Sequence, residues 1–179
     1  MRTITEAVAA LKRGEIIAYP TESTWGLGVD ANNQHAVTAL SQLKNRPQSK
    51  AFIVLVDNLD RIKHWIDFSQ LPTAIDPYEG WPGPITKLFP TASACPTWLS
   101  LNNRIAVRVS AHPITMTLCH AFSGPVISTS ANPSGKETLA TAAAITTCFG
   151  EHISTIVPGE PGDQPPTRIV CLVTGTNIR

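Results

Sequence analysis

A cluster of cations is the first group of residues whose types could do chemistry. Lys44, Arg46 and Lys50 lie in the segment K-N-R-P-Q-S-K, and no acidic residue occurs between Gln34 and Val56. Arginine offers a planar fork of donors and lysine a mobile point charge, so cations that converge on one loop suit a polyphosphate. A simple basic turn is the alternative interpretation of the same residues.

Small hydroxyl and amide side chains form a second group, in the segment S-T-S-A-N-P-S-G that follows the apolar run GPVI. At the carboxyl end of a strand, such side chains let a ligand approach the backbone and offer it several donors. An ordinary turn rich in serine and asparagine is the alternative.

Arg108 is the third feature, because it is a charge inside the apolar run RIAVRV. A buried charge is costly unless it is paired or bound to an anion. Strand alternation places Val107 and Val109 on one face and Arg108 on the other, beside Ala106. A salt bridge to a structural Asp or Glu remains an alternative. Together, the three features indicate an anion-binding pocket, but they do not identify its substrate.

Several familiar motifs are misplaced. The segment from Gly26 to Ala31 has the spacing of a dinucleotide fingerprint, but it does not directly follow the apolar run that ends at Pro20, so no Rossmann site is expected. Ser130 occupies the place of the first P-loop glycine before Gly135-Lys136, which argues against a Walker-type phosphate loop. There is no H-E-x-x-H or G-x-S-x-G motif.

The cysteines and histidines do not predict a metal site. The four cysteines are far apart in the sequence and have no C-x-x-C pair, so we expect buried, reduced thiols; they are Cys95, Cys119, Cys148 and Cys171. No protein-ligated metal is predicted.

Composition favours one ordinary globular domain. The chain has 179 residues, of which 42% are hydrophobic and 15% charged, and its net charge is +1. A domain of this length buries roughly 70% of the surface that its unfolded chain exposes. The near-neutral charge gives no whole-molecule field for nonspecific nucleic-acid binding. No apolar run resembles a signal peptide or a membrane span, so we expect a soluble, cytoplasmic protein.

The elements that position these groups alternate between helix and strand patterns. Thr3 and Glu6 form a capping box, and the residue before Pro47 is biased away from helix. Helices are expected near 3–14, 32–46, 112–122 and 139–148, and strands near 15–20, 51–56, 104–109, 124–129, 152–157 and 168–173.

Two further segments are less regular. An amphipathic stretch places Leu59, Ile62, Trp65 and Ile66 on one face, and the prolines of W-P-G-P-I-T-K-L-F-P restrict that segment to a sheet edge or to the first residue of a strand. Because no repeat or linker interrupts the pattern, we expect one α/β domain over residues 1–179 with a twisted sheet of parallel and antiparallel strands.

At this point the chain resembles the YrdC/Sua5/TsaC family of threonylcarbamoyl-AMP synthases. The segment YPTESTWGLG is similar to the family's YPTET-aromatic-GLG motif, Lys44-Asn45-Arg46 to its K-x-R, and Ser130-Ala131-Asn132 to its S-x-N. The segments WPGPIT, AVRV followed by HP, and SANPSG occur in the family's order. Because the sequence ends at Arg179, it resembles the short TsaC-type form. The resemblance implies a single YrdC-like domain with a concave ligand crevice.

The resemblance also implies a reaction. L-threonine captures bicarbonate as a carbamate, which attacks the α-phosphate of ATP and expels pyrophosphate; Mg²⁺ accompanies the ATP. The product, threonylcarbamoyl-AMP, would pass to a separate complex that modifies adenosine 37 of ANN-decoding tRNAs. The implied partners are therefore ATP, L-threonine, bicarbonate and this transfer complex, together with a weak tRNA or double-stranded RNA contact, and no membrane.

The roles of individual residues follow from the same resemblance. Lys44 and Arg46 would be catalytic. The ATP-binding residues would be Lys44, Arg46, Lys50, Ser130, Asn132, Thr138 and Arg179. The threonine-binding residues would be Ser23, Arg108, Ser128 and Thr167.

The chain departs from the family pattern at three places. Leu55 replaces a common histidine beside threonine, Lys50 replaces a common asparagine, and Pro-Thr-Arg replaces E-S-T around Thr167. These changes affect the predicted geometry of the amino-acid pocket rather than the reaction class. The main alternative function is a double-stranded RNA- or tRNA-binding protein without a catalytic role. A domain of a hydrogenase-maturation carbamoyltransferase is another alternative, although the acylphosphatase and zinc-finger segments are absent.

Overall fold

The computed structural model describes residues 3–47 and 50–178 of the chain. Four α-helices are present in these ranges: α1 (Ile4–Lys12), α2 (Gln34–Leu43), α3 (Pro113–Phe122) and α4 (Ala142–Phe149). The strands are β1 (Ile17–Pro20), β2 (Trp25–Gly28), β3 (Ile53–Leu55), β4 (Ile85–Pro90), β5 (Arg104–Arg108), β6 (Val126–Ser130), β7 (Thr155–Ile156) and β8 (Arg168–Cys171).

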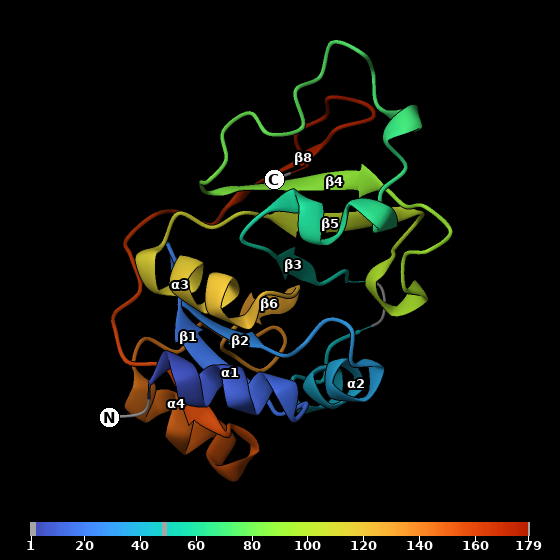
Figure 1. Ribbon diagram of the computed structural model, residues 1–179. Coiled ribbons are helices and arrows are strands. Elements are labelled where there is room, and N and C mark those ends of the chain that lie inside the picture. The colour runs from blue at the N-terminus through green and yellow to red at the C-terminus, as the bar shows by residue number, and fades with distance from the viewer. Residues whose placement is uncertain (1–2, 48–49, 179) are drawn as a thin grey trace.

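The strands of the described residues form one eight-stranded sheet in the order β7-β1-β2-β6-β3-β5-β4-β8. The pairs β1–β7, β3–β5 and β4–β8 are parallel, and the other neighbouring pairs are antiparallel. Figure 1 shows the sheet running from β8 near the C-terminus to β1 beside α1. The prediction of a single α/β domain with a mixed sheet is confirmed.

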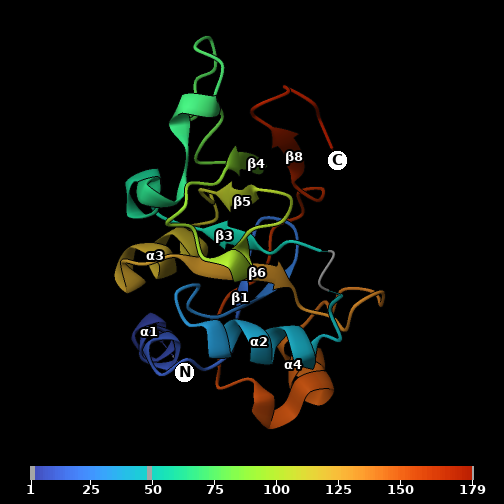
Figure 2. The ribbon, with the colours of Figure 1, turned by 90° about the vertical axis from the view of Figure 1, so that its right-hand side faces the viewer.

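Apolar side chains cover both faces of the sheet, because successive strand residues point to opposite sides. On β1, Ile17 and Tyr19 join a cluster with α1 and α3, whereas Ala18 joins a second cluster with α2 and α4. Helices α1 and α3 pack against each other, and Figure 2 shows them together on one side of the strands. The sheet is thus the rigid central layer from which the site residues project.

The helix starts agree with the local signals. Thr3 accepts a hydrogen bond from the Glu6 amide and Glu6 returns one, so the predicted capping box is confirmed. Asn33 caps α2 in the same way, through the amide of Ala36. Helix α2 ends at Leu43, which leaves Lys44 at the C-cap. No helix in the described ranges has the length and apolar character needed to cross a membrane.

The strand β2 was not predicted. Its sequence is WGLG, and two glycines in four residues weaken any intrinsic strand preference. Tertiary packing requires them: a Cβ on Gly28 would lie 2.8 Å from the Tyr19 ring and 2.6 Å from the Ile127 carbonyl oxygen. The glycines therefore let the Tyr19 ring lie across β2. The first three residues of the apparent dinucleotide motif, Gly26 to Gly28, belong to this strand. Five residues then separate Gly28 from the start of α2, so the motif does not lead directly into a helix.

The expectation that prolines restrict residues 81–90 to a sheet edge or to the first residue of a strand was wrong. Strand β4 lies inside the sheet, antiparallel to β5 and parallel to β8. The prolines lie at its ends. Pro82 and Pro84 precede the strand, and Pro90 is its last residue. The pairing with β8 stops at Leu88, so Pro90 lies beyond it. No ladder hydrogen bond is therefore lost to a missing N–H.

The four cysteines are free, but they are not all buried. Cys95, Cys119 and Cys171 are buried, whereas Cys148 is exposed on α4, which corrects the expectation of four buried thiols. Burial raises the pKa of Cys119 to about 12 and that of Cys95 to about 11. The thiol groups of Cys95 and Cys119 therefore stay protonated and act as small apolar groups.

Candidate active site

One cavity of about 400 Å³ collects most of the predicted site residues, and we call it the main cavity. Its walls come from the turn before β2, the ends of β3, β5 and β6, and the segment leading into β8. Seven residues predicted from the sequence line it: Ser23, Arg46, Arg108, Ser128, Ser130, Thr138 and Thr167. Residues from six separate parts of the chain thus meet in one place.

Arg108 lies at the end of β5 with only 4% of its surface exposed, and it lines the main cavity. Its Nη2 is 3.5 Å from Oε2 of Glu22, which is also buried. Arg108 is therefore paired with an acid, as one alternative from the sequence had it, and it also lines the main cavity. Glu22 was not identified from the sequence, where it appeared only as one letter of the YPTESTWGLG motif.

Glu22 is fixed from the other side. Its Oε1 accepts hydrogen bonds from the Ser110 hydroxyl at 2.8 Å and from the Ala111 amide at 2.9 Å. Burial raises the pKa of this carboxyl, but the charge of Arg108 and the hydrogen bonds from Ser110 and Ala111 lower it more, so its pKa lies below the usual value. Glu22 is therefore an ionised carboxylate at neutral pH.

Arg46 is held by neutral groups. Its guanidinium donates to the carbonyl oxygens of Lys50 and Ala51, at 3.3 and 2.6 Å, and to the Thr129 hydroxyl at 3.4 Å. It also lies 4.6 Å from the centre of the Phe52 ring. These contacts orient the group without neutralising it, which leaves its full charge available to an anion in the main cavity.

Lys44 is buried, with 1% of its surface exposed, and does not line the main cavity. Its Nζ donates to the carbonyl oxygens of Ser130 and Asn132, and the Lys44 carbonyl accepts from the Ser134 amide. Burial, and then the charge of Arg46, lower the pKa of Lys44 to about 8. In this arrangement the ammonium group faces the backbone of the S-x-N segment instead of the cavity.

Asn132 supports the same segment from within. Its Oδ1 accepts from the Ser130 hydroxyl at 2.5 Å, and its Nδ2 donates to the carbonyl oxygens of Pro133 and Lys136, at 3.1 and 2.6 Å. Asn132 is itself buried and is not among the residues that line the main cavity. Lys44 and Asn132 therefore shape the loop that presents Ser130, whereas Ser130 and Thr138 line the cavity.

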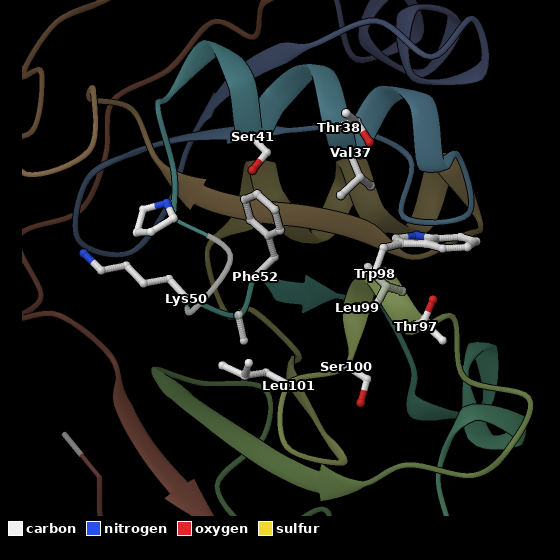
Figure 3. A pocket seen from close by; sticks show the side chains of 12 residues that line it. Val37, Thr38, Ser41, Lys50, Phe52, Thr97, Trp98, Leu99, Ser100 and Leu101 are labelled. Carbon is white, nitrogen blue, oxygen red and sulfur yellow. The ribbon is translucent and has the colours of Figure 1, made fainter.

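Lys50 is placed differently from the other predicted residues. It is exposed and borders a second cavity of about 420 Å³, between α2 and residues 97–101. Figure 3 shows its side chain extending away from Trp98, which lies at the opposite side of this cavity. Ala51 borders both cavities, so the segment held by Arg46 separates them. Arg179 lies outside the described residues.

A loop ahead of β8 closes one side of the main cavity. The amide of Gly162 donates to the Thr21 carbonyl at 2.9 Å, and the amide of Gln164 donates to the Glu22 carbonyl at 3.0 Å. A Cβ on Gly162 would lie 2.4 Å from the Glu22 carbonyl oxygen, so only glycine permits this close approach. Gln164 lines the cavity and was missed in the sequence, where only its position three residues before Thr167 could have indicated it.

The main cavity combines Arg46 and Arg108 with hydroxyls from β6, from the turn before β2 and from the loops that hold Thr138 and Thr167. We call Lys44 and Arg46 the Arg46 group, and Arg108 with Glu22 the Arg108 group. Neither Lys44 nor Arg46 pairs with a carboxylate in the part of the chain that the structure describes, whereas Arg108 does. No cluster of three or more His, Cys, Asp or Glu suited to a metal ion occurs in that part. The arrangement can bind a polyanion beside a smaller polar molecule.

Curated relatives match the chain over nearly all of its length. A protein of Xanthomonas oryzae pv. oryzae named threonylcarbamoyl-AMP synthase is 40% identical over 181 residues, covering 99% of this chain and 97% of the relative. A protein of the same name from Enterobacter sp. is 37% identical over 180 residues, covering 99% of this chain and 95% of the relative.

Solved structures share the fold. P. abyssi Sua5 complexed with L-threonine superposes with a TM-score of 0.82 at 26% identity, over 94% of this chain; the chain spans 50% of that protein's length. E. coli YciO superposes with a TM-score of 0.80 at 24% identity, over 98% of this chain and 86% of that one. Residues 9–179 match the Sua5/YciO/YrdC family model, which is described as "Telomere recombination". The chain therefore belongs to the Sua5/YciO/YrdC family.

Proposed function

We propose that this chain synthesises threonylcarbamoyl-AMP from L-threonine, bicarbonate and ATP. The observation that carries the proposal is that seven residues predicted for the two larger substrates line one cavity. The shared name of the full-length relatives supports the same activity. P. abyssi Sua5, of which this chain spans half, is complexed with L-threonine in its solved structure, which supports the amino-acid part of the proposal.

The Arg46 group suits the phosphates of ATP. Arg46 faces the main cavity with its charge unpaired, and Ser130 and Thr138 supply hydroxyls on the same cavity. Lys44 adds a second positive charge from behind and holds the loop that presents Ser130. Mg²⁺ enters as the counter-ion of ATP and is part of the substrate. Lys50 and Arg179 remain predicted contacts of the nucleotide.

The Arg108 group suits the amino acid. Arg108 can donate two parallel hydrogen bonds to the threonine carboxylate. Ser23, Ser128 and Thr167 supply hydroxyls on the same cavity, and Thr167 is oriented by a 3.2 Å hydrogen bond between its Oγ1 and that of Thr86. Arg108 and Glu22 together are formally neutral. Binding of a zwitterionic amino acid therefore changes the net charge of the site little.

The reaction then proceeds in two steps. The threonine amine forms a C–N bond with the carbon of bicarbonate, and water leaves, which gives a carbamate. A carbamate oxygen attacks the α-phosphorus, and the bond to the β-phosphate oxygen breaks, which releases pyrophosphate. Both steps depend on charge stabilisation and on the relative placement of the substrates more than on a strong general base. In this proposal the adenylate then passes to the machinery that modifies tRNA. The proposal also includes a direct contact between this chain and RNA.

A product assay tests the proposal. The protein is incubated with ATP, bicarbonate and threonine, and pyrophosphate and the adenylate are measured, the latter by mass spectrometry. We expect both products only when all three substrates are present. Absence of the adenylate, together with double-stranded RNA binding that weakens steeply with salt, would support the alternative of an RNA-binding protein.

A further inference from the structure

Glu22 lies behind Arg108 as seen from the main cavity. It does not line the cavity, although its neighbours Thr21 and Ser23 do. The side chains of Glu22 and Arg108 are 7% and 5% exposed, so water screens their interaction little. The two residues are distant in the sequence and meet only because the turn before β2 packs against the end of β5.

The hydrogen bonds of this pair are incomplete. Among the described residues, Oε2 of Glu22 and Nε of Arg108 are buried without a hydrogen-bond partner. The 3.5 Å separation between Oε2 and Nη2 permits attraction between the charges, but it is at the limit of hydrogen-bond length. Arg108 therefore keeps donors for another acceptor, while its charge is already compensated.

Glu22 cannot easily follow a displaced Arg108. Ser110 and Ala111 fix its Oε1, and its backbone carbonyl accepts from Gln164. The carboxylate is thus a fixed anion at the rear of the cavity, and it limits the directions in which the guanidinium can point. A buried group locked by such partners is the usual means of holding a binding side chain in one geometry.

We propose that Glu22 is a positioning residue for the amino-acid substrate: it orients Arg108 and compensates its charge, so that the guanidinium presents its free donors to the substrate carboxylate. This inference rests on the proposed function and deepens it. Glu22 acts through Arg108 and does not touch the substrate. Ser110 contributes by holding the carboxylate.

The first test replaces Glu22 by glutamine. In Glu22→Gln one amide orientation places the NH₂ group, which accepts no hydrogen bond, against the Ser110 hydroxyl and the Ala111 amide. The other orientation turns its N–H donors toward those of Arg108. In either case the guanidinium loses its fixed orientation. We expect the threonine KM to rise at least about tenfold, as for other residues that orient a ligand-binding group. We expect kcat at saturating threonine and ATP affinity without threonine to change little. Ser110→Ala should raise the threonine KM less, by about threefold.

A double-mutant cycle distinguishes positioning from a general structural role. If Glu22 acts through Arg108, Glu22→Gln adds almost nothing to the threonine KM of Arg108→Lys. Additive effects of the two changes would overturn the inference. Asp57→Asn is the matched control, because Asp57 pairs with Arg61 outside the main cavity and should leave the threonine KM unchanged.

Three other outcomes are decisive. If Glu22→Gln does not fold, the smaller Ser110→Ala change still tests the inference, and an unaltered threonine KM in that variant overturns it. If the unaltered protein forms no adenylate, the proposed function fails. If it is active and Glu22→Gln keeps the same threonine KM, only the inference about Glu22 fails.

Discussion

The Arg46 group and the Arg108 group are held in opposite ways. The Arg46 group is bound by carbonyl and hydroxyl oxygens, which orient its charges and leave them uncompensated. The Arg108 group contains its own carboxylate, so its formal charge is zero. The first arrangement suits a polyanion and the second a zwitterion. The partner atoms of each arginine therefore distinguish a group suited to a polyanion from a group suited to a zwitterion. The cations alone do not make this distinction.

The largest expected effect is the loss of ATP binding or turnover on removal of Arg46. Arg46→Ala deletes the unpaired charge and frees the carbonyl oxygens of Lys50 and Ala51, so we expect ATP binding or turnover to lose about 2–4 kcal/mol. The fold should persist, because Arg46 is partly exposed and lies outside the apolar clusters. Turnover at subsaturating ATP and the melting temperature provide the measurements. Unchanged turnover would show that Arg46 does not contact the phosphates.

Substrate analogues sharpen the description of the Arg108 side. Hydroxyl-bearing residues on this cavity should hydrogen-bond the threonine hydroxyl, so valine leaves polar groups unpaired while serine lacks only a methyl group. We expect kcat/KM to fall much more for valine than for serine, and to fall about tenfold for serine. Adenylate formation from each amino acid, measured by mass spectrometry, is the check. Equal turnover of valine and threonine would exclude a polar pocket.

A conservative change at Arg108 tests whether the fork of donors is needed. Lysine keeps the charge opposite Glu22 but cannot make two parallel hydrogen bonds to a carboxylate. Arg108→Lys should raise the apparent threonine KM at least about tenfold, or about 1.4 kcal/mol. ATP binding measured by calorimetry without threonine should hardly change. An unaltered threonine dependence would mean that Arg108 serves only its pair with Glu22.

The smallest expected effect concerns pH and the Arg46 group. The pKa of Lys44 is lowered to about 8, so its charge is present below this pH and is lost as the pH rises through it. Loss of one nearby positive charge should weaken ATP binding by on the order of 1 kcal/mol, or about fivefold. ATP affinity without threonine, measured by calorimetry between pH 7 and 9.5, tests this. The same decline in Lys44→Met would assign the effect to another group.

The sequence predicted those features whose signals are local. Thr3, Glu6 and Asn33 cap helices through contacts within three residues, and these starts were predicted correctly or within two residues. Strand β2 could not be predicted in this way. Its glycines are explained by the Tyr19 ring, and the packing of a side chain from another strand is invisible to local propensity.

The same distinction applies to the site. The residue types singled out Arg46, Arg108 and the segment that contains Ser128 and Ser130. The family resemblance added Ser23, Thr138 and Thr167. These seven residues line one cavity. The direction of Lys44 could not be predicted, because its ammonium bonds to carbonyls 86 and 88 residues further along the chain. The pairing of Glu22 with Arg108 is equally non-local. Composition suggests which groups exist, but only the packed sheet determines which atoms face one another.

The loop at residues 162–167 has a consequence for how the site comes into existence during synthesis. Chains emerge from the ribosome with the N-terminal part first. The turn before β2 and the ends of β3, β5 and β6 are made early, but Gly162, Gln164 and Thr167 come after them. Strand β8, which anchors the far end of this loop, must also find β4, made some eighty residues earlier. A nascent chain of this protein therefore has no complete cavity until β8 has been translated.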